Sequence, residues 1–128
     1  MTDEIDTIAS AFFAAIERGD LDAIHELYSP QAEIWHNVTN RVQTREENLA
    51  LLKFFTGRVS ERRYEVLARH FFAGGFVQRH ILHGRLESGE LIAAPVCLVI
   101  HISEGRIDRV FEYLDPATVR AAFARDPG

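Results

Sequence analysis

The chain has 128 residues, enough for one domain with a hydrophobic core, and 47% of them are hydrophobic. Its net charge of -5 at pH 7 argues against a nucleic-acid partner, because phosphate recognition depends on a basic surface. The sequence contains no run of about 20 apolar residues, which argues against a membrane-spanning helix.

Two further features bear on the compartment. The start of the chain, Thr2-Asp3-Glu4, is acidic and lacks the basic-then-apolar pattern of a secretory leader. Cys97 is the single cysteine, so it has no intramolecular disulfide partner, and such cysteine usage suits a reducing compartment. We therefore expect a cytoplasmic protein that has neither nucleic acid nor a membrane as a partner.

Helical spacing dominates the first part of the chain. Apolar side chains recur every three or four residues over 5–16, which predicts an amphipathic helix that ends near Gly19. Asp20 can cap a second, shorter helix, which Pro30 closes. We expect a short strand over residues 32–37.

A third helix is predicted by its start signal. Thr44 and Glu47 have the three-residue spacing of a capping box, in which each side chain satisfies a backbone amide of the other. The apolar positions of this helix are Leu49, Leu52 and Phe55. We expect it to end near Gly57.

The rest of the chain alternates in the manner of strands. The expected strands cover residues 62–72, 76–86 and 91–103, and a last strand follows residue 105. The turns between them fall at Gly74-Gly75, Ser88-Gly89 and Glu104-Gly105. Asp115 then caps a terminal helix that has Pro116 at its first position.

This order of elements predicts the fold class. Helices that are segregated from an antiparallel meander make an α+β domain, here a single one over residues 1–128. We expect a cone-shaped, curved antiparallel sheet, wrapped by the three N-terminal helices around a pocket, with a short C-terminal helix. The strand over 96–103 is apolar on both faces, so we expect a second copy of the chain to cover its outer face in a homodimer.

The last strand carries a carboxylate on an apolar face. Glu112 shares a face with Val110, because side chains alternate along a strand. A carboxylate that is buried without a partner is strongly unfavourable. Glu112 should therefore lie at an open rim, serve a function in a pocket, or pair with a sheet arginine such as Arg79 or Arg85.

Several short strings occur in order along nearly the whole chain. They are Gly19-Asp20-Leu21-Asp22-Ala23-Ile24, Tyr28-Ser29-Pro30-Gln31-Ala32, Ile34-Trp35-His36-Asn37, Gly105-Arg106-Ile107 and Glu112-Tyr113-Leu114-Asp115. Together they resemble the nuclear transport factor 2-like, or SnoaL-like, superfamily. The resemblance implies a pocket for an apolar, oxygenated small molecule and chemistry without a cofactor. The superfamily includes ketosteroid isomerases, limonene-epoxide-hydrolase-like enzymes, polyketide cyclases, dehydratases and non-catalytic binding domains, so the fold does not settle the function.

The resemblance can be followed residue by residue. Against the base, tyrosine and protonated aspartic acid of ketosteroid isomerase, this chain has His36, Phe12 and Cys97. Phe12 has no hydroxyl and a thiol is a weak donor, so steroid isomerisation is disfavoured while His36 remains a sensible base. Against limonene epoxide hydrolase, Glu112 matches one catalytic aspartate, but Pro95 and Cys97 stand where an arginine and a second aspartate are needed.

These two alignments disagree over one segment. The first turns His36 into the pocket, whereas the second turns Trp35 and Asn37 inward. Adjacent strand residues point to opposite faces, so both alignments hold only where the strand is bent or bulged.

His36 and Glu112 are the candidate catalytic residues. Neutral imidazole near pH 7 suits proton abstraction or the activation of water, and the alternative for His36 is a bond to backbone at a strand end. Glu112 could act as an acid with a raised pKa, as a base, or as a group that orients His36.

The remaining candidates would contact the ligand. They are Trp35, Asn37, Tyr64, His80, Cys97 and Val110. For the large aromatic side chains and for Cys97, the alternative is packing in the core. His80 and His83 are three residues apart and face opposite sides of a strand, so they predict no metal pair, and no other grouping has zinc-ligand spacing.

Two classes of function follow from these residues. The first is a cofactor-independent isomerase, dehydratase, cyclase or hydrolase that uses acid–base chemistry at His36 and Glu112 on an apolar, oxygenated small molecule. The second is a non-catalytic ligand-binding or dimerisation module of the same fold, which the missing oxyanion tyrosine and arginine–aspartate pair favour.

Overall fold

The computed structural model describes residues 2–124, which form four α-helices and six strands. The first half contains α1 (Thr2–Arg18), α2 (Leu21–Leu27), β1 (Tyr28–His36), β2 (Arg41–Thr44) and α3 (Arg45–Arg58). The second half contains β3 (Val59–Phe72), β4 (Gly75–Leu86), β5 (Leu91–Ser103), β6 (Arg106–Leu114), a 3₁₀ turn (Pro116–Thr118) and α4 (Arg120–Phe123). The predicted α+β class is confirmed.

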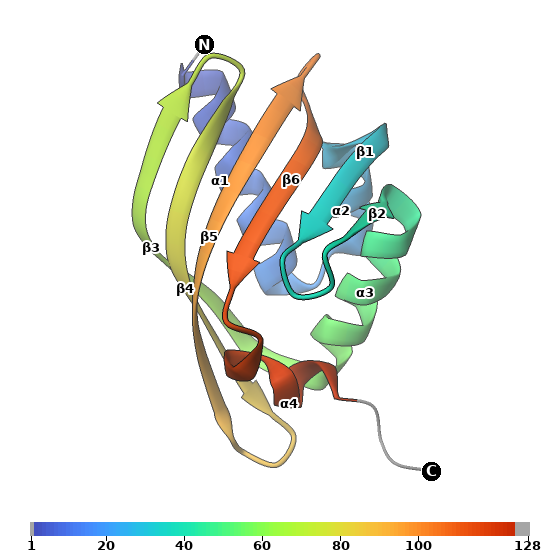
Figure 1. Ribbon diagram of the computed structural model, residues 1–128, viewed down its shortest axis with the longest axis vertical. Coiled ribbons are helices and arrows are strands. Elements are labelled where there is room, and N and C mark those ends of the chain that lie inside the picture. The colour runs from blue at the N-terminus through green and yellow to red at the C-terminus, as the bar shows by residue number, and fades with distance from the viewer. Residues whose placement is uncertain (1, 125–128) are drawn as a thin grey trace.

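The strands form one curved sheet in the order β2-β1-β6-β5-β4-β3 (Figure 1). Strands β3 to β6 make the predicted antiparallel meander. The sheet as a whole is mixed, because β1 pairs in parallel with β6, and β2 adds an antiparallel edge that the sequence did not predict. Strand β2 has only four residues, and three of them are polar or charged, so it has almost no alternation signal.

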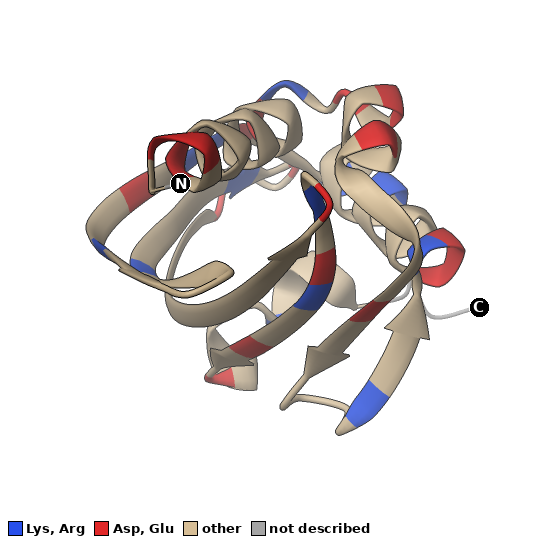
Figure 2. Cartoon of the chain, turned by 90° about the horizontal axis from the view of Figure 1, so that it is seen from above, with Lys and Arg blue, Asp and Glu red and all other residues tan. Residues whose placement is uncertain are grey.

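The helices cover the concave side of the sheet, and the strands curve around the space beneath them (Figure 2). Strand β3 has irregular pairing with β4 at two points, between Ser60 and Arg63 and between Val66 and Ala68. Such irregularities bend a strand and increase its twist. The inward residues of β5, Val96, Leu98 and Ile100, are buried against the helices. Curvature and helical cover together create the interior space in which the candidate site lies.

Two predicted helix starts and one turn are confirmed in detail. The Thr44 hydroxyl accepts from the Glu47 amide at 3.2 Å, and the Glu47 carboxylate accepts from the Thr44 amide at 2.9 Å. The Asp20 side chain accepts from the amide of Ala23 at 3.1 Å. Gly74 turns β3 into β4 with a φ of +84°, a conformation that glycine adopts without strain.

The predicted helix start at Asp115 and Pro116 opens a 3₁₀ turn instead of an α-helix. The Asp115 carboxylate accepts from the amide of Ala117 at 3.0 Å, but Pro116 then opens a 3₁₀ turn, and α4 is only a single helical turn. The short C-terminal helix is therefore present, although Asp115 caps the turn in front of it.

Arg62 joins the ends of two helices to the sheet. Its guanidinium donates to the carbonyl oxygens of Ile16 and Thr56, both at 3.0 Å, and to the carbonyl of Val59. Ile16 and Thr56 lie in the last turns of α1 and α3, where backbone carbonyls have no helical partner and a cation is favourable. This side chain thereby helps fix the two helices that wall the interior space.

Within residues 2–124, every helix is too short or too polar to cross a membrane.

Candidate active site

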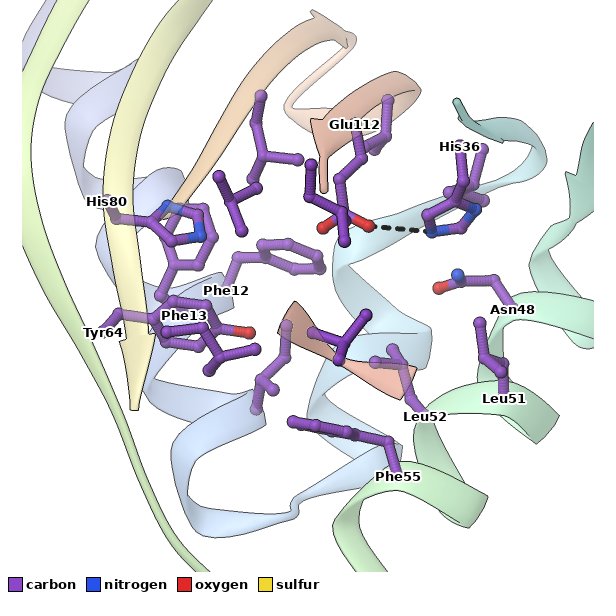
Figure 3. Close-up of a pocket in the computed structure, with 18 of the residues that line it drawn as sticks. Phe12, Phe13, His36, Asn48, Leu51, Leu52, Phe55, Tyr64, His80 and Glu112 are labelled. Carbon is purple, nitrogen blue, oxygen red and sulfur yellow. Dashed lines mark ion pairs between the residues drawn. The ribbon is translucent and has the colours of Figure 1, made fainter. Parts of the chain in front are cut away.

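A cavity of about 90 Å³ lies between the concave face of the sheet and helices α1 and α3 (Figure 3). Six of its lining residues carry polar groups: Tyr28, His36, Asn48, Tyr64, His80 and Glu112. The others are apolar: Phe12, Phe13, Ile16, Ile34, Leu51, Leu52, Phe55, Leu82, Val96, Leu98, Val110, Leu114, Val119 and Phe123. We call this space the inner chamber.

A second space of about 440 Å³, the outer chamber, adjoins the first. The turn between β1 and β2 lines it through Val38 and Thr39, and the C-terminal segment lines it through Pro116 and Arg120. Both chambers are lined by His36, Leu51, Glu112, Leu114, Val119 and Phe123. The two candidate catalytic residues therefore lie where the chambers meet.

His36 and Glu112 are brought together by the parallel pairing of β1 with β6. The two residues are direct partners in that register, and both side chains point inward. His36 Nε2 lies 3.3 Å from Glu112 Oε1, as the dashed line in Figure 3 shows. The predicted alternative for Glu112, a pair with Arg79 or Arg85, is not formed. Arg85 pairs with Glu61 on β3, and Arg79 is the register partner of Cys97, which lines neither chamber.

Burial favours the uncharged form of both groups. It raises the pKa of the Glu112 carboxyl to about 7 and lowers the pKa of the His36 imidazole. Removing a carboxylate or an imidazolium from water disfavours the charged state. The arrangement that burial favours is therefore a protonated carboxyl group beside a neutral imidazole.

The inner end of the chamber holds Tyr64 and His80. The Tyr64 ring packs against Phe13 and against the edge of His80, with ring centroids 4.9 Å apart in both cases. Burial, with a smaller contribution from the Glu112 charge, raises the pKa of the Tyr64 hydroxyl, which therefore stays protonated. Burial and the charge of Arg69 lower the pKa of His80 to about 4, so that its imidazole is neutral at pH 7.

Three polar residues of the interior are not among the predicted site residues. Tyr28 donates from its hydroxyl to Asn48 Oδ1 at 2.7 Å, and both line the chamber. Gln78 is fully buried beneath it. Signals for two of them exist: Asn48 shares a helix face with Leu52, and Gln78 lies on the inward face of β4, two residues from His80.

The structure separates the predicted ligand contacts into two groups. Tyr64, His80 and Val110 line the inner chamber, whereas Trp35, Asn37 and Cys97 line neither chamber. The expectation that these last three face the pocket is corrected by the geometry of β1 and β5.

Strand β1 pairs regularly with β6 from Glu33 to His36, so alternation holds and His36 takes the inward position. Trp35 packs on the outer face, with its ring 5.2 Å from that of Tyr113. Asn37 instead bonds twice to the backbone of Leu114, each time at 3.0 Å.

Cys97 faces outward because side chains alternate along β5. It is the register partner of Tyr113 on β6 and of Arg79 on β4, while its neighbours Val96 and Leu98 face inward. Over residues 2–124, no three His, Cys, Asp or Glu side chains are grouped closely enough to hold a metal ion.

Comparisons with known proteins place the chain in a family. A family model described as the SnoaL-like domain matches residues 9–110. No curated protein sequence matches the chain.

Solved structures share the fold at low sequence identity. IdmH from Streptomyces antibioticus, a putative polyketide cyclase, is 18% identical with a TM-score of 0.80, over 91% of this chain and 96% of its own. An LEH-like epoxide hydrolase from M. tuberculosis is 17% identical with a TM-score of 0.78, over 94% and 89%. A hypothetical protein with a ketosteroid isomerase-like fold from Catenulispora acidiphila, in complex with trimethylamine, is 14% identical with a TM-score of 0.78, over 90% of each chain.

At such identity, the likeness of structures shows the fold alone. The family model covers most of the chain and agrees with the resemblance seen in the sequence. The protein therefore belongs to the SnoaL-like domain family.

Proposed function

We propose that this protein is a cofactor-independent acid–base catalyst that acts on an apolar, oxygenated small molecule. The observation that carries the proposal is the approach of His36 Nε2 to within 3.3 Å of Glu112 Oε1 at the junction of two largely apolar chambers. The reaction class is isomerisation, dehydration, cyclisation or hydrolysis, all of which proceed by proton transfer. The polyketide cyclase and epoxide hydrolase among the structural neighbours are compatible with this range.

The roles of the two residues follow from their favoured protonation states. Neutral His36 would accept a proton from a C–H group of the ligand or from a water molecule. Protonated Glu112 would deliver one to an oxygen of the ligand. The uncharged pair thus supplies a base and an acid on adjacent strands.

The sizes of the chambers limit how a ligand can bind. Pockets for drug-sized ligands measure about 300–1,000 Å³. The inner chamber, at about 90 Å³, is smaller than this, whereas the outer chamber, at about 440 Å³, lies within the range. We therefore expect a ligand to place one end in the inner chamber and the larger part in the outer one, with its reacting atoms beside His36 and Glu112.

The chain supplies a matched control for the experiment. His83 and Glu65 form a second histidine–carboxylate pair, with Nε2 and Oε1 2.8 Å apart, outside both chambers. A library of cyclic ketones, enones, epoxides and β-hydroxy ketones is screened for turnover with the wild-type protein. The double variant His36→Ala, Glu112→Gln should lose this turnover, whereas His83→Ala, Glu65→Gln should keep it. Equal turnover by both double variants would exclude the proposed roles.

The second candidate function is a non-catalytic ligand-binding module. The observation in its favour is that Phe12 and Phe13 occupy the wall of the inner chamber without a hydroxyl, so the oxyanion tyrosine of ketosteroid isomerase has no counterpart at Phe12. A ligand that binds with micromolar affinity and is recovered unchanged after prolonged incubation would support this function over catalysis.

We also propose a homodimer through the outer face of the sheet. Phe72 and Tyr113 on the outer face of the sheet are exposed, although large aromatic side chains generally pack in cores or interfaces. A second copy of the chain would cover them. Sedimentation at micromolar concentration should give the mass of a dimer, and a monomer would refute this assembly.

The reducing cytoplasm is the location that we propose for this protein, because its sequence has a single cysteine.

A further inference from the structure

We infer that the inner end of the cavity binds an uncharged acceptor oxygen of the ligand, such as a ketone oxygen, through the Nε2–H of His80 and the hydroxyl of Tyr64. The inference rests on the proposed function only in placing the ligand in this cavity. It adds a substrate class, carbonyl compounds, and a positioning device that holds His80 in one tautomer.

The tautomer of His80 follows from its hydrogen-bond partners. Arg69 Nε donates to Gln78 Oε1 at 2.7 Å, and a guanidinium has no acceptor, so this oxygen must face Arg69. The Gln78 amide nitrogen is thereby turned to His80 Nδ1, which lies 2.9 Å away. An amide nitrogen only donates, so Nδ1 must accept and the ring proton is on Nε2.

Arg69 is itself fixed from the first helix. Its NH1 group donates to Asp6 Oδ1 at 2.7 Å and to Ser10 Oγ at 3.1 Å, both on α1. Its guanidinium also lies 5.8 Å from the ring centroid of Phe76. The chain of contacts from Asp6 through Arg69 and Gln78 to His80, which we call the relay, therefore begins at the surface and ends at the cavity.

His80 has a ring donor at the wall of the inner chamber. The residue is 2% exposed and lines the inner chamber. Among residues 2–124, no acceptor is within hydrogen-bond reach of its Nε2. Because His80 lines the chamber, this donor is open to an acceptor atom of a ligand.

The Tyr64 hydroxyl adds a second donor at the same end. Figure 3 shows it directed into the chamber, from a ring that packs against the ring of His80. Within the described chain it has no hydrogen-bond partner. The backbone amide of Tyr64 donates to Glu17 Oε2 on α1 at 2.8 Å, which anchors this residue as the relay anchors His80.

The chemistry of the two donors selects the ligand atom. Both are neutral at pH 7 and stand among apolar side chains, which suits a carbonyl oxygen better than a carboxylate. A carbonyl that accepts two such hydrogen bonds is polarised, and the bonds strengthen as charge develops on the oxygen. Proton removal beside that carbonyl, at the His36 end, would become easier.

The tautomer is tested first, on the uniformly ¹⁵N-labelled wild-type protein. Two-bond ¹H–¹⁵N correlation spectra at pH 7 should show His80 as the Nε2–H tautomer, and the Nδ1–H form or a mixture would overturn the inference. In Gln78→Glu, a carboxylate accepts from both neighbours, so His80 should change to a form protonated at Nδ1. Since the wild-type spectrum decides by itself, the test does not depend on the folding of the variant.

Acceptor binding is tested with two small probes of the same ring size, cyclopentanone and cyclopentane. The ketone at millimolar concentration should shift the His80 Nε2 resonance, and the hydrocarbon should shift it at least several-fold less. Tyr64→Phe should weaken ketone binding by about three- to tenfold, the usual effect of one lost hydrogen bond, and leave cyclopentane binding unchanged. Equal responses to both probes would overturn the inference.

These outcomes separate the inference from the proposed function. Nε2–H and ketone selectivity with no turnover of any library compound would support the inference and refute the catalytic proposal. Turnover that depends on His36 and Glu112, with an Nδ1–H tautomer at His80, would support catalysis and refute the inference.

Discussion

The two ends of the cavity each hold one histidine, and their neighbours give them different chemistry. At the junction of the chambers, His36 faces the carboxyl of Glu112 directly, at 3.3 Å. At the inner end, His80 faces the neutral amide of Gln78, and Arg69 bonds to the other side of that amide. A carboxyl whose pKa is near 7 can exchange a proton with imidazole, whereas an amide only orients it. The neighbour therefore decides whether the imidazole moves a proton or holds one in place.

The largest expected effect comes from removing the acid of the junction. Glu112→Gln keeps the shape of the side chain but has no exchangeable acidic proton, so kcat on any substrate found should fall by about 10²- to 10⁴-fold. Glu65→Gln, the surface counterpart, should leave kcat within about twofold. Steady-state kinetics measure both, and equal kcat values for the two variants would show that the two carboxyl groups do not differ in role.

The pH dependence of the reaction distinguishes a mechanism in which Glu112 is the acid from one in which Glu112 is the base. With a neutral His36 base and a protonated Glu112 acid, kcat/KM should fall about tenfold per unit above pH 7 and should also fall at acid pH as His36 gains a proton. In Glu112→Gln the loss above pH 7 should disappear. A rate that rises through pH 7 and then levels off would show that the Glu112 carboxylate is the base.

The pH dependence of the protein's stability should also reveal the raised pKa of Glu112. The folded-state pKa of Glu112, about 7, lies above its ordinary value of 4.5, so the folded state binds the proton more tightly. This contribution is present below pH 4.5 and is lost as pH rises through 7. Glu112→Gln should therefore gain stability relative to the wild type from pH 4.5 to 8, by about 1–3 kcal/mol. Urea denaturation at several pH values measures the difference, and a constant difference would contradict the raised pKa.

His80 should give a pH dependence of stability that is opposite in sign and of the same order. Its folded-state pKa, about 4, lies below the ordinary value of 6.5, so the neutral form is favoured in the folded protein. This contribution is present above pH 6.5 and is lost as pH falls through 4. The wild type should lose about 1–2 kcal/mol relative to His80→Gln between pH 6.5 and 4. Parallel stability curves over that range would show that His80 is not held neutral by its surroundings.

The two faces of the sheet show which features of the site the sequence could predict and which it could not. Alternation along the last strand correctly places Glu112 on the same face as Val110, and the capping box of Thr44 and Glu47 marks the start of α3 to the residue. Alternation also states that Trp35 and His36 face opposite sides, but it does not state which of them faces inward. That choice depends on the parallel pairing with β6, more than seventy residues later in the chain.

The relay was beyond prediction for a related reason. Arg69 and Gln78 meet because they are register partners across the β3–β4 hairpin, and the pairing on that hairpin is irregular between Val66 and Ala68. One residue of slippage turns a side chain to the other face, so the register cannot be read from either strand alone. Asp6 then joins from a helix whose placement on the sheet no local signal gives.

The most direct test of the account is a ¹³C titration of the Glu112 carboxyl carbon in the wild-type protein, with the ¹⁵N signals of His36 recorded in the same samples. The account predicts that the carboxyl titrates near pH 7 beside a neutral imidazole. A carboxyl that titrates below pH 5, next to a His36 that stays cationic above pH 7, would show a fixed ion pair. It would contradict the claim that the junction holds a protonated carboxyl group beside a neutral imidazole.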